Sequence, residues 1–163
     1  MEIIPATRSE HLATTRALFR EYERFLDVDL CFQGFEEELA GLPGKYAPPE
    51  GALFLAVEGA EVGGCVALRA LEPGVCEMKR LFVRPGCRGR GLGRALADAI
   101  IAAAAAKGYA VMRLDTLPKL QDAIRLYARL GFRTVAPYYP NPLPGVSYWE
   151  IELNAHGSRE ETL

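Results

Sequence analysis

The chain of 163 residues contains no run of eighteen apolar residues, close to the length that a membrane-spanning helix needs. Residues 1–5 also lack the basic and apolar regions of a secretory signal peptide. Positive charge is not in excess, since the formal net charge is −2. We therefore expect a cytoplasmic protein with no membrane and no nucleic acid as partner.

Cysteine is scarce as well, and its four residues form no CxxC pair. Such spacing provides neither the ligands of a zinc site nor a disulfide framework, so we expect free thiols and no bound metal. The four are Cys31, Cys65, Cys76 and Cys87. Cys87 stands beside Arg88 and could be a reactive thiolate, but a spectator thiol is the favoured interpretation.

The remaining composition is that of an ordinary globular protein, half hydrophobic and one quarter charged. The length corresponds to one domain with a sizeable core. We find no internal repeat and no sign of a second domain. The sequence thus predicts a single domain over residues 1–153 and a polar C-terminal tail over residues 154–163.

The most informative stretch covers residues 76–96. It predicts a strand, a basic loop with Gly89, Gly91 and Gly93, and then an alanine-rich helix. Glycines leave backbone N–H groups uncovered, and those at a helix start have no intrahelical acceptor. Six basic residues and no acidic one lie within residues 79–94. These features favour a ligand that carries phosphate.

The glycine spacing differs from two common phosphate motifs. The third glycine of the dinucleotide fingerprint comes three residues after the second, and no Gly-Lys-Ser/Thr closes a P-loop here. A plain turn between strand and helix is the simpler alternative. However, Arg88-x-x-Gly91-x-Gly93, between a strand and an Ala/Leu helix, closely resembles the acetyl-CoA motif of the GNAT N-acetyltransferase superfamily. A second segment, from Leu126-Tyr127 to Gly131-Phe132, also resembles this family.

Apolar periodicity and turn residues predict the rest of the fold. They indicate helices at residues 7–25, 35–42, 91–107 and 119–130, and strands at residues 3–6, 52–58, 62–71, 76–83, 111–116, 132–136 and 147–153. Residues 7–10 have the form of a capping box. The resemblance implies an α/β (α+β) GNAT acyl-CoA N-acyltransferase fold, with a central mixed, mostly antiparallel sheet flanked by helices and splayed between its fourth and fifth strands.

The resemblance also implies acetyl-CoA as co-substrate. Its peptide-like pantetheine arm would pair with an exposed strand edge, and its diphosphate would bind the amides and guanidinium groups of the basic loop. The residues expected to bind the coenzyme are Leu81, Phe82, Val83, Arg88, Gly89, Arg90, Gly91, Leu92, Gly93 and Arg94. Leu120 departs from the family pattern, because many relatives carry an asparagine there; Gln121 could compensate.

Acetyl transfer from a thioester to an amine requires a base for the amine proton and an acid for the leaving thiolate. The resemblance places the acid at Tyr127, with a packing aromatic as the alternative. For the base it offers Asp115 or Glu77. Either carboxylate could instead be an ordinary ion-pair partner at a strand end, and water could serve without them.

The acceptor site is indicated less directly. In this fold the first helix and the loop before the last strand wall the acceptor cleft, and the candidates are Tyr22, Phe25, Tyr138 and Asn141, with Tyr139 beside them. Packing or simple exposure explains these residues as well. Residues 21–38 are rich in acidic side chains, and such a run is most simply explained as a solvent-exposed surface. If some of these side chains line the cleft, they would attract a cationic amine.

We therefore expect an acetyl-CoA-dependent N-acetyltransferase that acts on a primary amine by direct attack in a ternary complex. No residue is indicated as the nucleophile of an acyl-enzyme. The acceptor can be a small molecule or a peptide. The sequence leaves open whether the protein forms a homodimer. A non-enzymatic sensor that binds acetyl-CoA or coenzyme A is the alternative.

Overall fold

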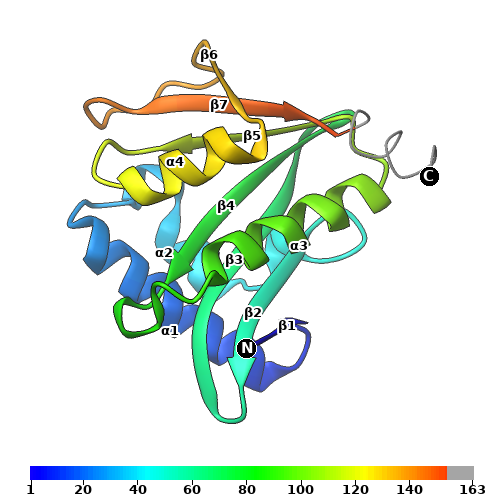
Figure 1. Ribbon diagram of the computed structural model, residues 1–163, viewed down its shortest axis with the longest axis vertical. Helices are drawn as coiled ribbons and strands as arrows, with labels where there is room; N and C mark the ends of the chain where they lie inside the picture. The colour runs from blue at the N-terminus through cyan, green and yellow to red at the C-terminus, as the bar shows by residue number, and fades with distance from the viewer. Residues whose placement is uncertain (154–163) are drawn as a thin grey trace.

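The structure is a computed structural model that describes residues 1–153, apart from the side chain of Phe32 (Figure 1). The tail predicted at residues 154–163 lies outside the described residues. Within this range, seven strands form one sheet in the order β1-β2-β3-β4-β5-β7-β6. The strands are β1 (Glu2–Pro5), β2 (Ala52–Glu58), β3 (Glu61–Glu72), β4 (Val75–Val83), β5 (Val111–Thr116), β6 (Arg133–Val135) and β7 (Ser147–Glu152). The helices are α1 (Ser9–Leu26), α2 (Phe35–Ala40), α3 (Leu92–Ala106) and α4 (Gln121–Leu130), with 3₁₀ turns η1 (Cys31–Gln33), η2 (Gly44–Tyr46) and η3 (Pro85–Cys87).

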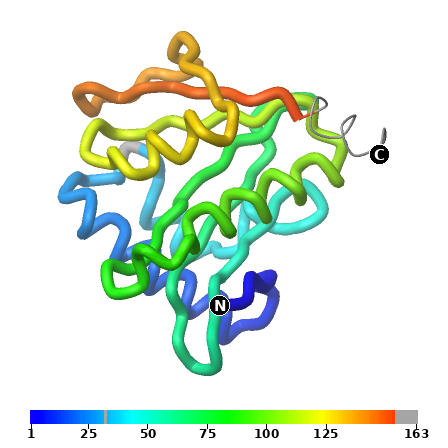
Figure 2. Tube along the Cα trace, in the orientation of Figure 1, coloured from blue at the N-terminus to red at the C-terminus, as the bar shows by residue number. Residues whose placement is uncertain are grey.

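Paired strands are antiparallel except for β4 and β5, which are parallel. The parallel pair follows from α3, which crosses over and returns the chain to the same end of the sheet. The predicted meander of β2, β3 and β4 and the mixed, mostly antiparallel sheet are confirmed. The last strand, β7, lies between β5 and β6 (Figure 2).

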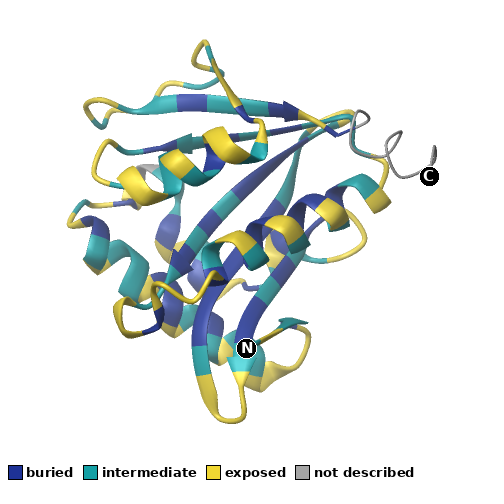
Figure 3. Ribbon diagram, viewed as in Figure 1, coloured by how far each residue is buried: buried dark blue, intermediate teal, exposed yellow. Residues whose placement is uncertain are grey.

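Helices cover both faces of the sheet (Figure 1). α3 and α4 pack on one face, where Ile100 and Tyr127 are buried, and α1 and α2 pack on the other, where Phe19 and Phe35 are buried. The small side chains of α3 let that helix approach the strands closely, so that Ala97 is fully buried. The burial pattern of α3 shows one buried and one exposed side (Figure 3).

The sheet opens between β4 and β5, as predicted. The two strands pair only at the beginning of each, from Val75 opposite Val111 to Glu77 opposite Arg113. Beyond that point β5 pairs with β7 alone, and β4 pairs with β3 alone. One edge of β4 is therefore left without a neighbouring strand over residues 78–83.

β4 also contains a bulge beside this opening. Its register with β3 shifts after Lys79, so that Arg80 and Leu81 together oppose Val66. Arg80 has a φ of 60°, which is uncommon for a residue other than glycine. A bulge interrupts the alternation of side chains along a strand and re-aims them.

The start of α1 differs from the predicted capping box. The helix begins at Ser9 with Arg8 as its N-cap, and His11 Nδ1 accepts a hydrogen bond from the Arg8 N–H at 3.3 Å. His11 thus takes the role expected of Glu10, whose carboxylate lies 3.2 Å from the Arg8 guanidinium instead. The other predicted elements are present, with ends that move by a few residues.

Within residues 1–153 no helix is both long and apolar enough to cross a membrane. The four cysteines are free thiols. Cys87 is buried and its Sγ lies 3.3 Å from Glu61 Oε1. Burial, together with this carboxylate, raises the pKa of the Cys87 thiol, which agrees with a spectator rather than a reactive thiolate.

Candidate active site

A cleft of about 500 Å³ lies where β4 and β5 separate. The unpaired edge of β4 at Leu81, Phe82 and Val83 lines one side, and the starts of α3 and α4 line the others. An extended, peptide-like ligand can pair with a strand edge of this kind.

The start of α3 contributes unpaired backbone N–H groups to the cleft. The first bond of the helix ladder runs from the Ala95 N–H to Gly91 O at 3.1 Å, and within residues 1–153 the N–H groups of residues 89–94 find no acceptor. Gly89 and Gly91 have φ values of 81° and 76°, which favour glycine, and neither has a neighbouring atom where a Cβ would stand. Uncovered amides at a helix N-terminus bind anions.

The three arginines expected at the diphosphate do not share one position. Arg88 lines the cleft, stacks over Phe25 at 4.5 Å from the ring centroid, and donates from Nε to Val83 O at 3.2 Å. Arg94 also lines the cleft and pairs with Asp98. The Arg90 guanidinium lies 3.7 Å from Glu61 and is not among the groups that line the cleft, so its side chain differs from the expectation.

A smaller inner cavity of about 40 Å³ adjoins the cleft, and both are lined by Tyr22, Leu81 and Leu120. Polar side chains from six parts of the chain line the inner cavity: Tyr22 of α1, Gln33 of η1, Lys79 and Arg80 of β4, Asp115 and Thr116 of β5, Tyr127 of α4 and Asn141 of the β6–β7 loop. The opening between β4 and β5 thus connects a helix start that has uncovered amides with a group of ionisable side chains at the inner cavity.

Tyr127 is buried and packs against Phe132, with ring centroids 5.7 Å apart. Burial raises the pKa of its hydroxyl far above the usual value, and the neighbouring Tyr22 and Asp115 act in the same direction. The hydroxyl is protonated at neutral pH, and its raised pKa makes it a weaker acid than an exposed tyrosine, so a role as proton donor depends on its position at the inner cavity rather than on its acidity.

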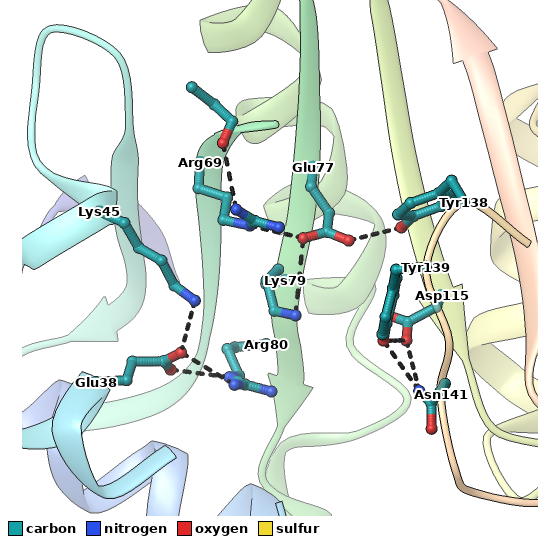
Figure 4. A network of polar contacts seen from close by, with 11 residues as sticks. Glu38, Lys45, Arg69, Glu77, Lys79, Arg80, Asp115, Tyr138, Tyr139 and Asn141 are labelled. Carbon is teal, nitrogen blue, oxygen red and sulfur yellow. Dashed lines mark hydrogen bonds and ion pairs between the residues drawn. The ribbon is translucent and has the colours of Figure 1, made fainter. Parts of the chain in front are cut away.

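Asp115 is held by the loop that precedes β7. Its Oδ2 accepts a hydrogen bond from the Tyr139 hydroxyl and another, at 3.0 Å, from Asn141 Nδ2 (Figure 4). These donors come from residues far away in sequence, and they fix the carboxylate at the wall of the inner cavity.

Glu77, the other candidate base, lies in an ion-pair network instead. Its side chain is 1 % exposed and accepts from Arg69 Nε at 2.8 Å and from the Tyr138 hydroxyl at 2.6 Å, with Lys79 Nζ at 3.7 Å (Figure 4). Burial raises the pKa of Glu77, but Lys79, Tyr138 and Arg69 together outweigh it and hold the pKa below its usual value. Glu77 and Tyr138 are both absent from the lining of the cleft and of the inner cavity.

Comparison with known proteins decides the family. Residues 12–132 match the Acetyltransferase (GNAT) family. The chain belongs to this family. An uncharacterized N-acetyltransferase of Schizosaccharomyces pombe is 45% identical to this GNAT protein over 141 residues, which cover 85% of this chain and 86% of the relative.

Solved structures agree with the fold of this GNAT chain. A Klebsiella pneumoniae protein described as an acyl-CoA N-acyltransferase has a TM-score of 0.72 at 27% identity and covers 93% of this chain and 97% of its own. A Salmonella typhimurium acetyltransferase, solved with its cofactor acetyl-CoA, has a TM-score of 0.71 at 20% identity and covers 94% of each chain. The predicted family, the predicted fold and a transferase activity are thereby confirmed.

The acceptor candidates divide between the two spaces of this GNAT structure. Tyr22 lines both, Asn141 lines the inner cavity, and Phe25 lies in the larger cleft beneath Arg88. The Tyr138 hydroxyl donates a hydrogen bond to Glu77.

Leu120, which departs from the asparagine that the family resemblance implies, lines both spaces. Gln121, which could compensate, lines the cleft, and its amide donates to Pro118 O. The side chain that could compensate for the asparagine thus bonds to its own loop, and the alternative that this contact is missing stays open.

Sequence reasoning missed two cations of the inner cavity, Lys79 and Arg80. Both were counted as part of the basic stretch before α3, as if they belonged with the phosphate site. The spacing of Glu77 and Lys79 along a strand places them on one face, and this was the available signal. The bulge that brings Arg80 to the same cavity has no comparable signal in the sequence.

Proposed function

We propose that this GNAT enzyme transfers the acetyl group of acetyl-CoA to a primary amine by direct attack within a ternary complex. One observation carries the proposal: the unpaired edge of β4 joins the uncovered amides of residues 89–94 to the inner cavity that holds Asp115 and Tyr127. The acceptor amine is a small molecule or the amine of a peptide.

The residues of the cleft fit the coenzyme. The N–H groups of residues 89–94, with the guanidinium groups of Arg88 and Arg94, are suited to a diphosphate. The edge of β4 at residues 81–83 is suited to the amides of the pantetheine arm. The acetyl-CoA in the Salmonella typhimurium relative supports this assignment, which includes all residues predicted for the coenzyme except the Arg90 side chain.

Acetyl-CoA supplies the thioester whose acyl group is transferred. The carboxylate of Asp115 lines the inner cavity and is the proposed acceptor of the proton that an alkylammonium of pKa near ~10.4 must lose. The Tyr127 hydroxyl is the proposed donor of the proton that the leaving sulfur takes. A backbone N–H on the edge of β4 is positioned by the bulge at Arg80 and is the proposed partner of the carbonyl oxygen.

Asp115 is a better candidate for the base than Glu77. Glu77 is enclosed by Arg69, Lys79 and Tyr138, and its lowered pKa makes it a weak proton acceptor. We assign Glu77 the task of holding Tyr138 and Lys79 in place, so that it acts through its neighbours rather than on the substrate.

Two measurements on the purified chain test this function. Isothermal titration with acetyl-CoA should give saturable binding, and a screen of amines should release coenzyme A as free thiol in proportion to the acetylated product. Binding without thiol release from any amine would favour the alternative of a coenzyme sensor. Absence of binding by folded protein would contradict both.

A further inference from the structure

The inner cavity lies beside an excess of positive charge. Three carboxylates, Glu38 of α2, Glu77 of β4 and Asp115 of β5, lie with four cations at or beside the cavity (Figure 4). These cations are Lys45, Arg69, Lys79 and Arg80. A buried cation that is not fully paired is costly, so this arrangement calls for an additional anion.

Three of the four cations have a close carboxylate partner. Arg80 donates to both oxygens of Glu38 at 3.0 and 3.1 Å, and Lys45 Nζ lies 3.3 Å from the same carboxylate. Arg69 donates to Glu77 at 2.8 Å. Their charges are therefore largely satisfied inside the protein.

Lys79 is the exception. Its side chain is only 7 % exposed, its ammonium lies 3.7 Å from Glu77 Oε1, and within residues 1–153 it donates no hydrogen bond. Both oxygens of Glu77 already accept closer bonds, from Arg69 and from Tyr138. Burial lowers the pKa of Lys79 and Glu77 acts against it, so an anion bound at this ammonium would favour its charged form. Lys79 lines the inner cavity.

The cavity has room for a small anionic group. A bound water needs roughly 10–15 Å³ of such space, so about 40 Å³ accommodates a group of carboxylate size. Lys79 and Asp115 line the same cavity from different strands, β4 and β5. A substrate that carries both an ammonium and a carboxylate offers one group of opposite charge to each of these side chains.

Two of the acidic residues that could instead attract a polyamine are paired with arginines, and three others, Glu23, Asp27 and Asp29, line a separate pocket. Glu36 makes two hydrogen bonds to Arg20, and Glu21 makes two to Arg84. Neither lines the inner cavity. The charge of this region thus disfavours an acceptor with several ammonium groups and no anion.

We propose that Lys79 binds a carboxylate of the acceptor, and that the acceptor class is an amine bearing a carboxylate, such as an amino acid, rather than a simple amine. This inference rests on the proposed acetyl transfer and specifies its substrate. Asp115 accepts the proton of the acceptor amine, and Lys79 binds the carboxylate of the same molecule.

The first test compares substrates on the unaltered protein. Each amino acid of a panel is assayed by thiol release beside its primary amide and its decarboxylated amine, which keep the amine and lose the carboxylate. We expect kcat/KM for the best amino acid to exceed that of its amide by about 10- to 100-fold, the usual value of a hydrogen bond to a charged group. Equal rates for the amide overturn the proposal.

The second test replaces the cation. Lys79→Met should raise KM for the amino acid by about 10- to 100-fold and leave the dissociation constant of acetyl-CoA unchanged, while Lys79→Arg should retain part of the affinity. Lys45→Met removes a charge of the same network from outside the cavity and should leave KM unaltered. An equal effect of Lys79→Met on amino acid and amide would contradict carboxylate binding.

The outcomes separate this proposal from the proposed function. Release of thiol by simple amines but by no amino acid overturns the carboxylate site alone and leaves acetyl transfer standing. If no amine releases thiol with protein that binds acetyl-CoA, the carboxylate site and the proposed acetyl transfer are both overturned. Should Lys79→Met fail to fold, as circular dichroism would reveal, the comparison of amino acids with their amides on the unaltered protein still decides the question.

Discussion

Gly93→Ala should separate the stability of the protein from its affinity for the coenzyme. Gly93 is the second residue of α3 and, unlike Gly89 and Gly91, has no positive φ. A Cβ added there would stand 3.7 Å from Leu126 Cδ2 and 3.9 Å from Val83 Cγ2, which are ordinary contacts. The free protein can accept this methyl group without strain.

The two expected effects have opposite signs. Alanine favours a helix over glycine by up to about 1 kcal/mol, and we expect about 0.5 kcal/mol in the first turn, or a rise in Tm of about 1–2 °C. The new methyl group lies between two side chains that line the cleft, in front of the uncovered amides. Displacing the diphosphate from one charge-assisted hydrogen bond costs about 1.5 kcal/mol, so the dissociation constant of acetyl-CoA should rise about tenfold or more.

Scanning calorimetry and isothermal titration measure these effects. Gly86→Ala is the matched control, because Gly86 is in the same loop, has open space for a Cβ, and lies outside the lining of the cleft. It should leave the affinity for acetyl-CoA unchanged. An unaltered dissociation constant for folded Gly93→Ala would refute the assignment of the helix start as the diphosphate site.

Three further predictions concern the inner cavity and its surroundings. Tyr127→Phe should lower kcat by about 10²-fold or more with little change in acetyl-CoA affinity, which single-turnover kinetics and calorimetry can separate. Asp115→Asn should lower kcat/KM at neutral pH. This loss of kcat/KM should become smaller at higher pH, where the free amine is already deprotonated. A loss of the same size at all pH values would argue against Asp115 as the base. Burial raises the pKa of Glu38, but Arg80 and Lys45 outweigh it and hold the pKa below 4.5, so its contribution to stability is present above that pH and is lost as the pH falls further. Thermal melts should give Glu38→Gln a lower Tm than the unaltered protein, and its Tm should fall less as the pH drops below 4.5. An equal fall of Tm in both proteins would contradict the reasoning.

The fold could be predicted because local signals agree with one another along most of the chain. Gly89, Gly91 and Gly93 follow an apolar strand and precede an alanine-rich helix, and the structure places this order at an unpaired strand edge. The family resemblance, which depends on such local motifs, indicated Tyr127 on α4 and Asp115 at the end of β5, and both line the inner cavity. Residues fixed by neighbours in sequence were thus located well.

Contacts between distant segments were beyond such reasoning. Arg90 lies two residues after Arg88 in sequence but pairs with Glu61 of β3, so closeness in sequence did not give a shared phosphate site. Tyr138 was expected at the acceptor, and its hydroxyl instead donates to Glu77 across sixty-one residues. In both cases a partner that the sequence pattern does not indicate decides where the side chain points.

The bulge in β4 explains why the cations of the inner cavity could not be read from periodicity. A regular strand alternates its side chains, so Lys79 and Arg80 would point to opposite faces. Arg80, with its φ of 60°, breaks this alternation, and both side chains line the same cavity. A left-handed conformation of a residue other than glycine costs about 1–2 kcal/mol, and the two hydrogen bonds from Arg80 to Glu38 offset this cost. The ion pair that stabilises the bulge therefore also engages Arg80, and Lys79 is left as the cation available to a substrate.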